Sequence, residues 1–301
     1  MQGFSTARKY PHAWSRAAFH PGCRIIRIEA SDITMTNAHT QTRVALVTGA
    51  TGAIGGAIAR RLAATPGFRV VIVARDPAKA AAAVAEIREA SGNNDIHGEH
   101  ADLALLGDID ALARRWQGPL HVLVNNAAET PRERQITDEG IERQFATNVL
   151  GYFRLTRALT PALHAASAAR VVNVASYWAG GLDLDDLEFQ RRRYDNDSAY
   201  RQAKQADRML SAAFANRLQD CGIAVNACHP GDVRSRLAAS LGFGGHETPE
   251  QASRTPVWLA TDAVGGQLTG KYFEQQRVTP CRFASDPVAV EALYAVCSRY
   301  G

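Results

Sequence analysis

Residues 44–56 read VALVTGATGAIGG, a short apolar run followed by a glycine-rich turn, and the helical pattern AIARRLAAT follows at 57–65. A glycine-rich turn between a strand and a helix lets backbone N–H groups approach a phosphate, and the helix N-terminus adds favourable partial charge. Read as T-G-x-x-x-G-x-G, the turn has Ala53 in place of a glycine, whereas T-G-x-x-G-x-x-G fits through Gly49, Gly52 and Gly55. We expect Gly49 and Gly55 to shape the turn and Gly52 to compensate for the methyl group of Ala53.

Around this turn, apolar runs alternate with longer helical patterns along the chain. The runs are continuous rather than alternating, which indicates strands buried on both faces of a sheet. We expect strands at 44–47, 69–74, 120–124, 170–175 and 223–228, with a further strand, third in chain order, that ends at 102–103. We expect helices at 56–65, 77–91, 105–116, 138–166 and 199–220. Strands and helices that take turns imply right-handed crossovers and a parallel sheet with helices on both sides. The sequence therefore predicts an α/β fold with a doubly wound parallel sheet, the Rossmann fold, in a single domain.

Composition bounds the remaining possibilities. The chain has 301 residues, 46% of them hydrophobic, and a net charge of +4, of which the first 34 residues carry +3. A nearly neutral remainder argues against nucleic-acid binding, and no apolar run is long enough for a membrane span. The five cysteines form no C-x-x-C pair, so we expect no metal site and a cytoplasmic protein with reduced thiols.

The domain prediction is a flexible leader at 1–42 followed by the folded domain at 43–301. The leader has no continuous apolar segment of the kind found in secretory signals. A disordered tail, an upstream-extended start before Met35 and a transit peptide stay open as explanations of its basic composition.

The end of the second expected strand bears on the choice of dinucleotide. An acidic residue there would bind a ribose 2′-OH, whereas an arginine suits a 2′-phosphate. Ala74 stands where the acid is expected, and Arg75 follows it, so the sequence favours NADP(H) over NAD(H). Two alternatives stay open: Arg75 is solvated and paired with Asp76, or a register shift makes Asp76 the ribose ligand.

Polar and small residues follow the next two strands. Asp102, with Leu103, ends the third strand, where a carboxylate can accept from an adenine amino group. The run Asn125-Asn126-Ala127-Ala128 ends the fourth strand, where small side chains let a cofactor lie against the backbone and asparagines tie strand ends together. Because ligands bind outside the carboxyl ends of strands in open α/β sheets, the placement of these residues predicts a nucleotide site.

Four residues suggest the chemistry. Tyr200 and Lys204 lie four apart on an expected helix and share one face, and an ammonium beside a phenol lowers its pKa. Such a tyrosine can protonate a carbonyl oxygen while hydride reaches the carbon. Ser176 follows the fifth strand, where its hydroxyl can bind a substrate oxygen. Asn148 lies within the long helix expected at 138–166, an unfavourable place unless its side chain has a role such as holding a water.

This ordered set, with Pro230-Gly231 after the sixth strand, resembles the short-chain dehydrogenase/reductase superfamily from Val44 to about Phe273. The resemblance implies Tyr200 as general acid, Lys204 as ligand of the nicotinamide ribose, Ser176 as the group that polarises the carbonyl, and Asn148 in a water relay. The 24 positions from Ser176 to Tyr200 and the segment GKYF at 270–273 are similar to the retinol dehydrogenase-like and protochlorophyllide reductase-like branch. The expected cofactor ligands are Thr48, Gly49, Thr51, Gly52, Ala53, Ile54, Gly55, Arg75, Asp102, Leu103, Asn126, Ala127, Ala128, Tyr200, Lys204, Pro230, Gly231, Val233 and Ser235.

The expected substrate is a small lipophilic or aromatic ketone or aldehyde, or the matching alcohol. Aromatic and apolar residues flank the expected site at Tyr177, Trp178, Leu241 and Phe243, with few fixed charges. A role in secondary metabolism and a homo-oligomer stay open. The alternatives are a nucleotide-sugar epimerase or dehydratase of the extended branch, which the glycine spacing suits, and a non-enzymatic NADP sensor on the same fold.

Overall fold

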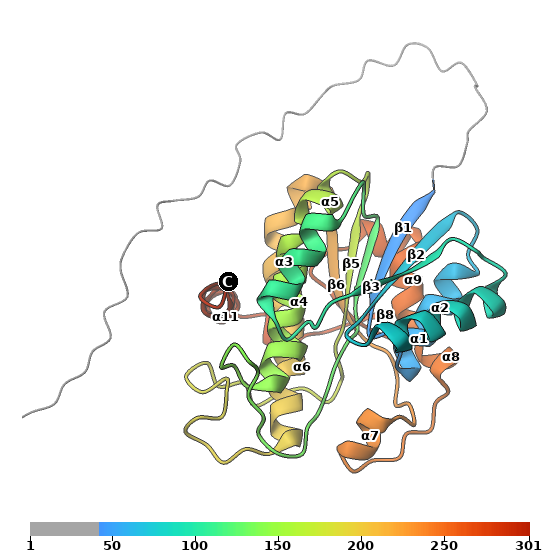
Figure 1. Ribbon diagram of the computed structural model, residues 1–301. Helices are drawn as coiled ribbons and strands as arrows, with labels where there is room; N and C mark the ends of the chain where they lie inside the picture. The colour runs from blue at the N-terminus through green and yellow to red at the C-terminus, as the bar shows by residue number, and fades with distance from the viewer. Residues whose placement is uncertain (1–41) are drawn as a thin grey trace, which may run out of the picture. The chain divides into compact units, whose positions relative to one another are not determined.

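An eight-stranded sheet runs through residues 42–301, the part of the chain that the computed structural model describes (Figure 1). Its strands are β1 (Arg43–Thr48), β2 (Phe68–Ala74), β3 (Ile96–His100), β4 (Val122–Asn125), β5 (Arg170–Val174), β6 (Ala224–His229), β7 (Tyr272–Glu274) and β8 (Arg277–Thr279). Neighbours pair in parallel from β3 to β7, and β8 pairs antiparallel with β7. The predicted doubly wound sheet is confirmed, with an unexpected hairpin at one edge. The leader predicted at 1–42 lies outside the described residues except for Thr42.

The strand order fixes where a ligand can enter. The sheet reads β3-β2-β1-β4-β5-β6-β7-β8, so the chain moves outward from β1 to β3 and then returns to the other side of β1. The connections that leave the carboxyl ends of β1 and β4 diverge at this point. In open α/β sheets such a reversal opens a crevice for ligands.

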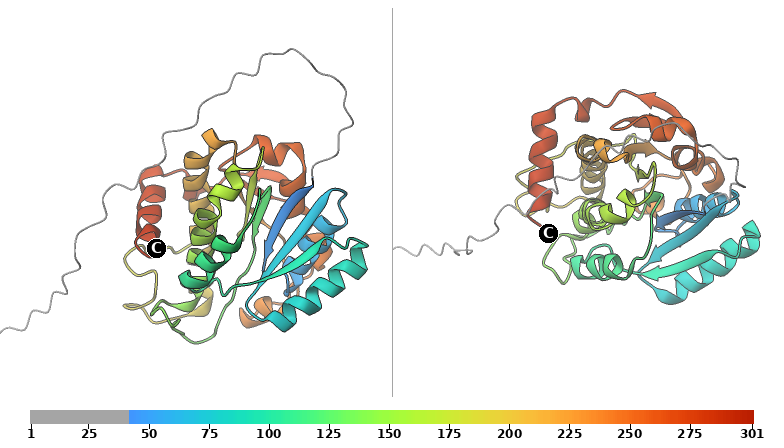
Figure 2. Two further views of the ribbon diagram at one scale, coloured as in Figure 1. Left: turned by 45° about the horizontal axis from the view of Figure 1, so that its top comes forward. Right: turned by 90° about the horizontal axis from the view of Figure 1, so that it is seen from above.

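Helices cover both faces of the sheet (Figure 2). On one face lie α1 (Ala53–Ala63), α2 (Pro77–Ser91), α8 (Pro249–Ala252), α9 (Arg254–Thr261) and α10 (Ala263–Gln267). On the other lie α3 (Leu106–Arg115), the π-helical segment η1 (Phe145–Leu150), α4 (Gly151–Ala158), α5 (Thr160–His164) and α6 (Asn196–Leu218), with α11 (Pro287–Ser298) packed on α6. The short helix α7 (Arg236–Ser240) and the 3-10 turns η2 (Gln219–Cys221) and η3 (Arg282–Ala284) complete the fold. Within 42–301 no helix combines the length and apolar character needed to cross a membrane.

Two large apolar clusters, one on each face, form most of the core. Successive residues of β1 alternate between them: Leu46 belongs to one cluster, and Ala45 and Val47 belong to the other. Since side chains of a strand point to opposite faces in turn, a strand covered by helices on both faces must be apolar at every position. This explains why the strands appear in the sequence as continuous runs.

The prediction of one long helix at 138–166 is wrong. Gly140 has a φ of +79°, and the Glu142 carboxylate accepts from the backbone N–H groups of Gln144 and Phe145, so helical structure begins only after Glu142, at Arg143. The segment then runs through η1 and α4 and breaks before α5, where Pro161 lies in the first turn. A proline supplies no backbone N–H, so it suits a helix start and interrupts a continuous helix.

Candidate active site

The glycine-rich turn between β1 and α1 is shaped by close backbone contacts. Gly49 has a φ of +69°, in the left-handed region, and a Cβ there would lie 2.7 Å from the Cα of Ala127. A Cβ on Gly55 would overlap the carbonyl oxygen of Gly49. Gly52 differs, because its φ of −100° suits any residue, and it serves as the N-cap of α1. If Gly52 compensates for the methyl group of Ala53, as the sequence predicts, it does not do so through a backbone conformation that only glycine adopts.

Thr48 and Asn126 fasten this turn to the end of β4. The Thr48 hydroxyl accepts from the backbone N–H of Asn126 at 2.8 Å and of Ala127 at 3.0 Å, and the Asn126 amide donates to the Thr48 carbonyl at 2.9 Å. The cradle is thus lined by glycine and by the small Ala127, and α1, a helix of 11 residues, begins at it, while Ala128 follows Ala127 and is half-buried. Such a cradle fits a pyrophosphate. The other expected ligands in the turn, exposed or half-buried, are Thr51, Ala53 and Ile54.

Arg75, directly after β2, is paired with Glu129, which follows the alanines after β4. Nη1 of Arg75 lies 2.9 Å from Oε2 of Glu129, while Oε1 of Glu129 accepts from the Thr147 hydroxyl at 2.7 Å and lies 2.9 Å from Nε of Arg143. The Arg75 side chain is still 57% exposed. Asp76, the alternative ribose ligand, instead caps α2 by accepting from two backbone N–H groups of its first turn. Arg75 is therefore an exposed cation at this rim, and Asp76 caps its own helix.

Asp102 lies two residues beyond β3, which ends at His100 rather than at Asp102 as expected. Its carboxylate accepts from the backbone N–H of Ala104 at 3.0 Å and lies 3.4 Å from Nη2 of Arg143. Leu103 is buried beside it. Arg143 thus links the acids that follow β3 and β4, and together with Arg75 they form a balanced group of two acids and two bases.

Ser176, Tyr200 and Lys204 meet beyond the carboxyl end of β5. Ser176 lies two residues after that strand, Tyr200 and Lys204 lie on the first half of α6, and all three are buried. Burial raises the pKa of the Tyr200 phenol, and a hydrogen bond with Ser176 opposes this rise. The lowering of this pKa that the sequence predicts from Lys204 stays a prediction.

The Lys204 ammonium donates to two acceptors in the protein interior. Nζ lies 2.9 Å from the Val174 carbonyl oxygen and 2.9 Å from Oδ2 of Asp207. It lies 5.8 Å from the centre of the Tyr200 ring. Burial alone would lower the pKa of Lys204, but attraction to Asp207 outweighs it and the pKa is raised. Lys204 is therefore a protonated group held by a buried carboxylate.

Asn148 lies in η1, and its side chain holds the backbone of Glu129. Its Oδ1 accepts from the Glu129 N–H at 2.9 Å, and its Nδ2 donates to the Glu129 carbonyl at 2.9 Å. π-Helical segments are rare and often occur at functional sites. The expectation that this asparagine has a specific role fits these bonds, and the water relay stays a prediction.

The turn after β6 lies next to the end of β5. Gly231 has a φ of +129°, and a Cβ there would overlap the carboxylate of Glu247. Pro230 is half-buried and Val233 is buried. The Ser235 hydroxyl oxygen accepts from the backbone N–H of Ala238 at 3.1 Å and so caps α7. The expected ligands in this turn thus have structural contacts of their own, and their contact with a cofactor stays a prediction.

Three of the four expected substrate residues are aromatic, and each of them packs against another ring. Trp178 and Phe243 pack edge to face with ring centres 5.3 Å apart, which brings the loop after β5 against the segment after α7. Tyr177 packs against His229 and donates to the Asp232 carboxylate at 3.1 Å, with 51% of its surface exposed. Leu241, half-buried, is the C-cap of α7.

Several residues of the site were missed in the sequence. Glu129 directly follows the Asn-Asn-Ala-Ala run, and Asp207 lies three positions after Lys204, so each stood beside a recognised motif. Arg208, also buried, donates to the Ser176 carbonyl and lies 3.5 Å from the centre of the Tyr272 ring. Helical spacing could have placed Asp207 beside Lys204. The contacts of Glu129 and Arg208 join segments far apart in the chain, which no local pattern reveals.

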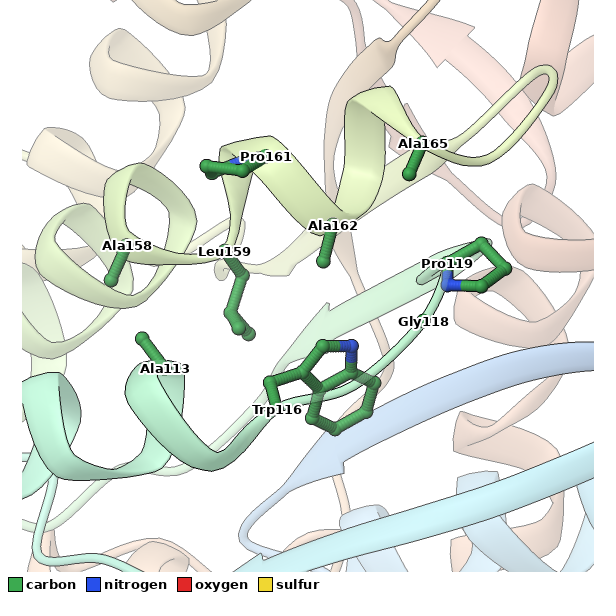
Figure 3. Close-up of a pocket in the computed structure, with 9 residues that line it drawn as sticks. All are labelled: Ala113, Trp116, Gly118, Pro119, Ala158, Leu159, Pro161, Ala162 and Ala165. Atoms are coloured by element: carbon green, nitrogen blue, oxygen red, sulfur yellow. The ribbon is translucent and has the colours of Figure 1, made fainter.

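An apolar hollow lies at the opposite end of the sheet and takes no part in this constellation (Figure 3). It is lined by Trp116, Pro119, Leu159 and Pro161 together with small residues. These residues precede β4 or lie around the break between α4 and α5. Among residues 42–301 no group of three or more histidine, cysteine, aspartate or glutamate side chains could hold a metal ion.

Comparison with known proteins assigns the family. The model of the short chain dehydrogenases matches residues 43–243. The chain is a short-chain dehydrogenase. It is 32% identical to human retinol dehydrogenase 13 over 278 residues, which cover 85% of this chain and 84% of the relative. It is 37% identical to a probable oxidoreductase of Streptomyces lividans, over 78% of this chain and 85% of the relative. The predicted superfamily, its retinol dehydrogenase-like branch and an NAD(P)-dependent oxidoreductase are confirmed.

Solved structures agree with this assignment. An uncharacterised protein from Mycobacterium paratuberculosis matches with a TM-score of 0.72 and 28% identity, over 86% of this short-chain dehydrogenase and 93% of that chain. An actinorhodin polyketide ketoreductase, solved as its F189W variant with NADPH, matches with a TM-score of 0.61 and 28% identity, over 77% and 95% of the two chains. These similarities also confirm the fold.

Proposed function

We propose that this short-chain dehydrogenase is an NADP(H)-dependent carbonyl reductase that transfers hydride between the nicotinamide and a lipophilic or aromatic ketone or aldehyde, or the matching alcohol. The observation that carries the proposal is the meeting of Tyr200, Ser176 and Lys204 at the carboxyl edge of the sheet. The glycine cradle at Gly49 and Gly55 opens on the same edge, two strands away.

Two observations support NADP(H) over NAD(H). Arg75 presents an exposed guanidinium at the end of β2, and Asp76 is occupied as a helix cap. Guanidinium groups bind phosphates through charge-assisted hydrogen bonds, so Arg75 suits a ribose 2′-phosphate. In addition, the ketoreductase with 28% identity was solved with NADPH.

The chain's own residues supply the acid and the orientation of the substrate. The bound dinucleotide supplies hydride to the carbonyl carbon. The Tyr200 hydroxyl gives its proton to the carbonyl oxygen, and the resulting phenolate regains a proton from solvent. The Ser176 hydroxyl binds the same oxygen, and Lys204 reaches a ribose hydroxyl beside it. Asn148 fixes the backbone at Glu129 through two hydrogen bonds.

The substrate class follows from the aromatic residues near this edge. The contact of Trp178 with Phe243 and the exposed ring of Tyr177 favour an apolar or aromatic compound. Relatives at 32% and 34% identity are named for retinol and polyprenol, both lipophilic alcohols. A role in secondary metabolism, the cytoplasmic location and the homo-oligomer stay predictions.

The nucleotide-sugar epimerase and the non-enzymatic sensor have less support. The chain after the turn at Pro230 forms β7 and β8 in the same sheet and helices packed on it, and in 42–301 it forms no separate sugar-binding lobe. The full set of Tyr200, Lys204, Ser176 and Asn148 is present, as a hydride-transferring enzyme requires.

The test is a substrate panel. Oxidation of NADPH by the purified full chain is followed with aromatic ketones, quinones, retinal and short polar aldehydes, and repeated with NADH. We expect turnover with lipophilic carbonyl compounds and a higher kcat/KM with NADPH than with NADH. Turnover confined to polar aldehydes would refute the substrate class, and equal kcat/KM values for the two cofactors would refute the cofactor preference.

A further inference from the structure

A carboxylate at the cofactor edge of the sheet divides its two oxygens between different partners. Glu129 follows the two alanines after β4, and its side chain is 20% exposed. Oε1 accepts from the Thr147 hydroxyl at 2.7 Å and lies 2.9 Å from Nε of Arg143. Oε2 lies 2.9 Å from Nη1 of Arg75. The function proposed above uses Arg75 and gives the Glu129 carboxylate no part.

The ion pair of Arg75 with Glu129 crosses the end of β1. Arg75 directly follows β2, Glu129 lies four residues after β4, and β1 lies between these two strands in the sheet. Neighbouring strands are about 4.8 Å apart, so about 10 Å separates the two strands that carry the pair. The glycine cradle leaves β1 at Gly49, between them. A dinucleotide that runs from the cradle to Arg75 therefore passes close to the Glu129 carboxylate.

The contacts of Glu129 hold it at this place. The Asn148 side chain accepts from its backbone N–H and donates to its carbonyl oxygen, both at 2.9 Å. Thr147 and Arg143 both contact Oε1, so the carboxylate would lose these contacts if it turned away from the cleft. The Arg75 side chain, by comparison, is 57% exposed, so its guanidinium can turn toward a ligand.

The charges around this contact sum to zero. Arg75 and Arg143 carry two positive charges. Glu129 and Asp102 carry two negative charges, and contacts of 2.9, 2.9 and 3.4 Å join the four side chains in a row. A ribose 2′-phosphate brings between one and two further negative charges to this neutral group. Without the charge of Glu129 the same group would carry one net positive charge and attract the phosphate more strongly.

We propose that Glu129 is a specificity-determining residue: its carboxylate competes with the ribose 2′-phosphate of NADP(H) for Arg75, and so limits the preference for NADP(H) over NAD(H). This inference rests on the proposed function, in which Arg75 binds that phosphate. The ribose of NAD(H) carries a neutral hydroxyl at this position, so the competition does not affect it. NADP(H) is therefore held less tightly than Arg75 alone would hold it, which eases the exchange of the oxidised and reduced cofactor.

The test is Glu129→Gln in the full chain, which removes the charge and keeps the size of the side chain. Cofactor fluorescence titration measures the Kd for NADPH and for NADH. We expect the ratio of the NADH Kd to the NADPH Kd to rise at least about fivefold, because a negative charge beside the phosphate is lost. The rise should shrink at high salt, since salt screens partly exposed charges. A loss of structure would instead weaken both cofactors.

Two smaller probes isolate the phosphate from the rest of the cofactor. Adenosine 2′,5′-bisphosphate and adenosine 5′-monophosphate differ only in the 2′-phosphate, and isothermal titration calorimetry measures the binding of each. In Glu129→Gln the bisphosphate should gain at least about fivefold more affinity than the monophosphate. An equal gain for both probes would contradict the proposal.

Two further variants keep the test decisive. Glu291→Gln removes an acid that pairs with Arg217 in the last turn of α6, so it changes the net charge equally and should leave the Kd ratio unchanged. Glu129→Gln is also made in the Arg75→Ala background, where the rise in the ratio should be smaller because there is no guanidinium to compete for. If circular dichroism shows that Glu129→Gln does not fold, Glu129→Ala takes its place.

The outcomes separate this inference from the proposed function. An unchanged or lower Kd ratio in the folded neutral variant, or an equal rise in Glu291→Gln, would overturn the role of Glu129. A rise that is just as large without Arg75 would overturn the competition for Arg75. Absence of turnover on the whole substrate panel would overturn the proposed reaction, and the binding titrations, which need no substrate, would still report whether Glu129 competes with the phosphate.

Discussion

Arg75 is the residue on which the proposed preference for NADP(H) depends, and its side chain also forms an ion pair with another residue of the chain. Its guanidinium is paired with Glu129, a carboxylate that also holds Arg143 and Thr147. A 2′-phosphate would approach the exposed side of Arg75 and meet a cation that is already ordered. Because the partner is anionic, Glu129 also reduces the net positive charge that the phosphate meets.

We expect Arg75→Ala to weaken NADPH binding and to leave NADH binding nearly unchanged. A hydrogen bond between charged groups contributes about 1.5–3 kcal/mol, which corresponds to about a 10–100-fold rise in the Kd for NADPH. Cofactor fluorescence titration measures both constants. The matched control is Arg69→Ala, an exposed arginine of β2 paired with Asp95 away from the cofactor edge, which should change neither Kd. An equal loss for NADH and NADPH would contradict the assignment of Arg75 to the phosphate.

Among the elements, α2 begins directly after Arg75 and Asp76, the two residues that the sequence offers as ligands of the adenosine ribose. Asp76 is its N-cap, Pro77 is its first residue, and the carboxylate accepts from the N–H groups of Ala78 and Lys79. An N-cap acid satisfies backbone donors that have no partner within the helix. The element therefore explains Asp76 without any ligand.

We expect Asp76→Ala to lower the midpoint of thermal unfolding, because α2 loses its cap, and to leave the ratio of NADPH to NADH affinity unchanged. Differential scanning fluorimetry and cofactor titration measure the two effects. Asp286→Ala removes the equivalent N-cap of α11. It should also lower the midpoint of thermal unfolding and leave the ratio of NADPH to NADH affinity unchanged. A selective loss of NADH binding in Asp76→Ala would revive Asp76 as the ribose ligand.

Most elements could be predicted because their signals are local. β1, β2 and β5 follow from apolar runs, and α2 was predicted with its observed bounds, Pro77–Ser91, because an aspartate-proline start and a glycine end mark it. The prediction of one helix at 138–166 was wrong because the observed helix boundaries depend on the carboxylate of Glu142 and on Pro161. The hairpin of β7 and β8 was missed because three-residue strands leave little periodicity to detect.

At the scale of the whole molecule, the C-terminal segment completes the face of the sheet that carries α6. Val290, Leu293 and Cys297 of α11 enter the same apolar cluster as α4 and α6. Tyr294 packs against Phe153 of α4, with ring centres 5.0 Å apart. The helix that carries Tyr200 and Lys204 is thus supported from outside by a segment that contains no motif of its own.

We expect Leu293→Ala to lower the free energy of unfolding by about 2–5 kcal/mol, because it leaves a cavity at a fully buried position between α11 and the core. Urea denaturation followed by circular dichroism measures the change. Val288→Ala on the same helix is the control: its side chain is 77% exposed, so the effect should stay within about 0.5 kcal/mol. A loss below 1 kcal/mol for Leu293→Ala would show that α11 adds little to the core.

The candidate site was predictable to the extent that its residues lie in local motifs. Tyr200, Lys204, Ser176 and the glycines were found because each belongs to a short pattern at a strand end or on a helix face. The ion pair of Lys204 with Asp207 was not predictable, because the sequence does not show that both side chains are buried. The same holds for Glu129, whose partners Arg75 and Thr147 lie directly after β2 and in η1.

The account depends most directly on Tyr200 as the proton donor of an NADPH-dependent reduction. The measurement is kcat/KM of Tyr200→Phe and of the wild type for the best carbonyl substrate, together with the Kd for NADPH. General acid catalysis contributes about 10²–10⁴-fold, so kcat/KM should fall by at least about 100-fold while the Kd is unchanged. Wild-type turnover in a folded Tyr200→Phe protein that binds NADPH normally would contradict the account.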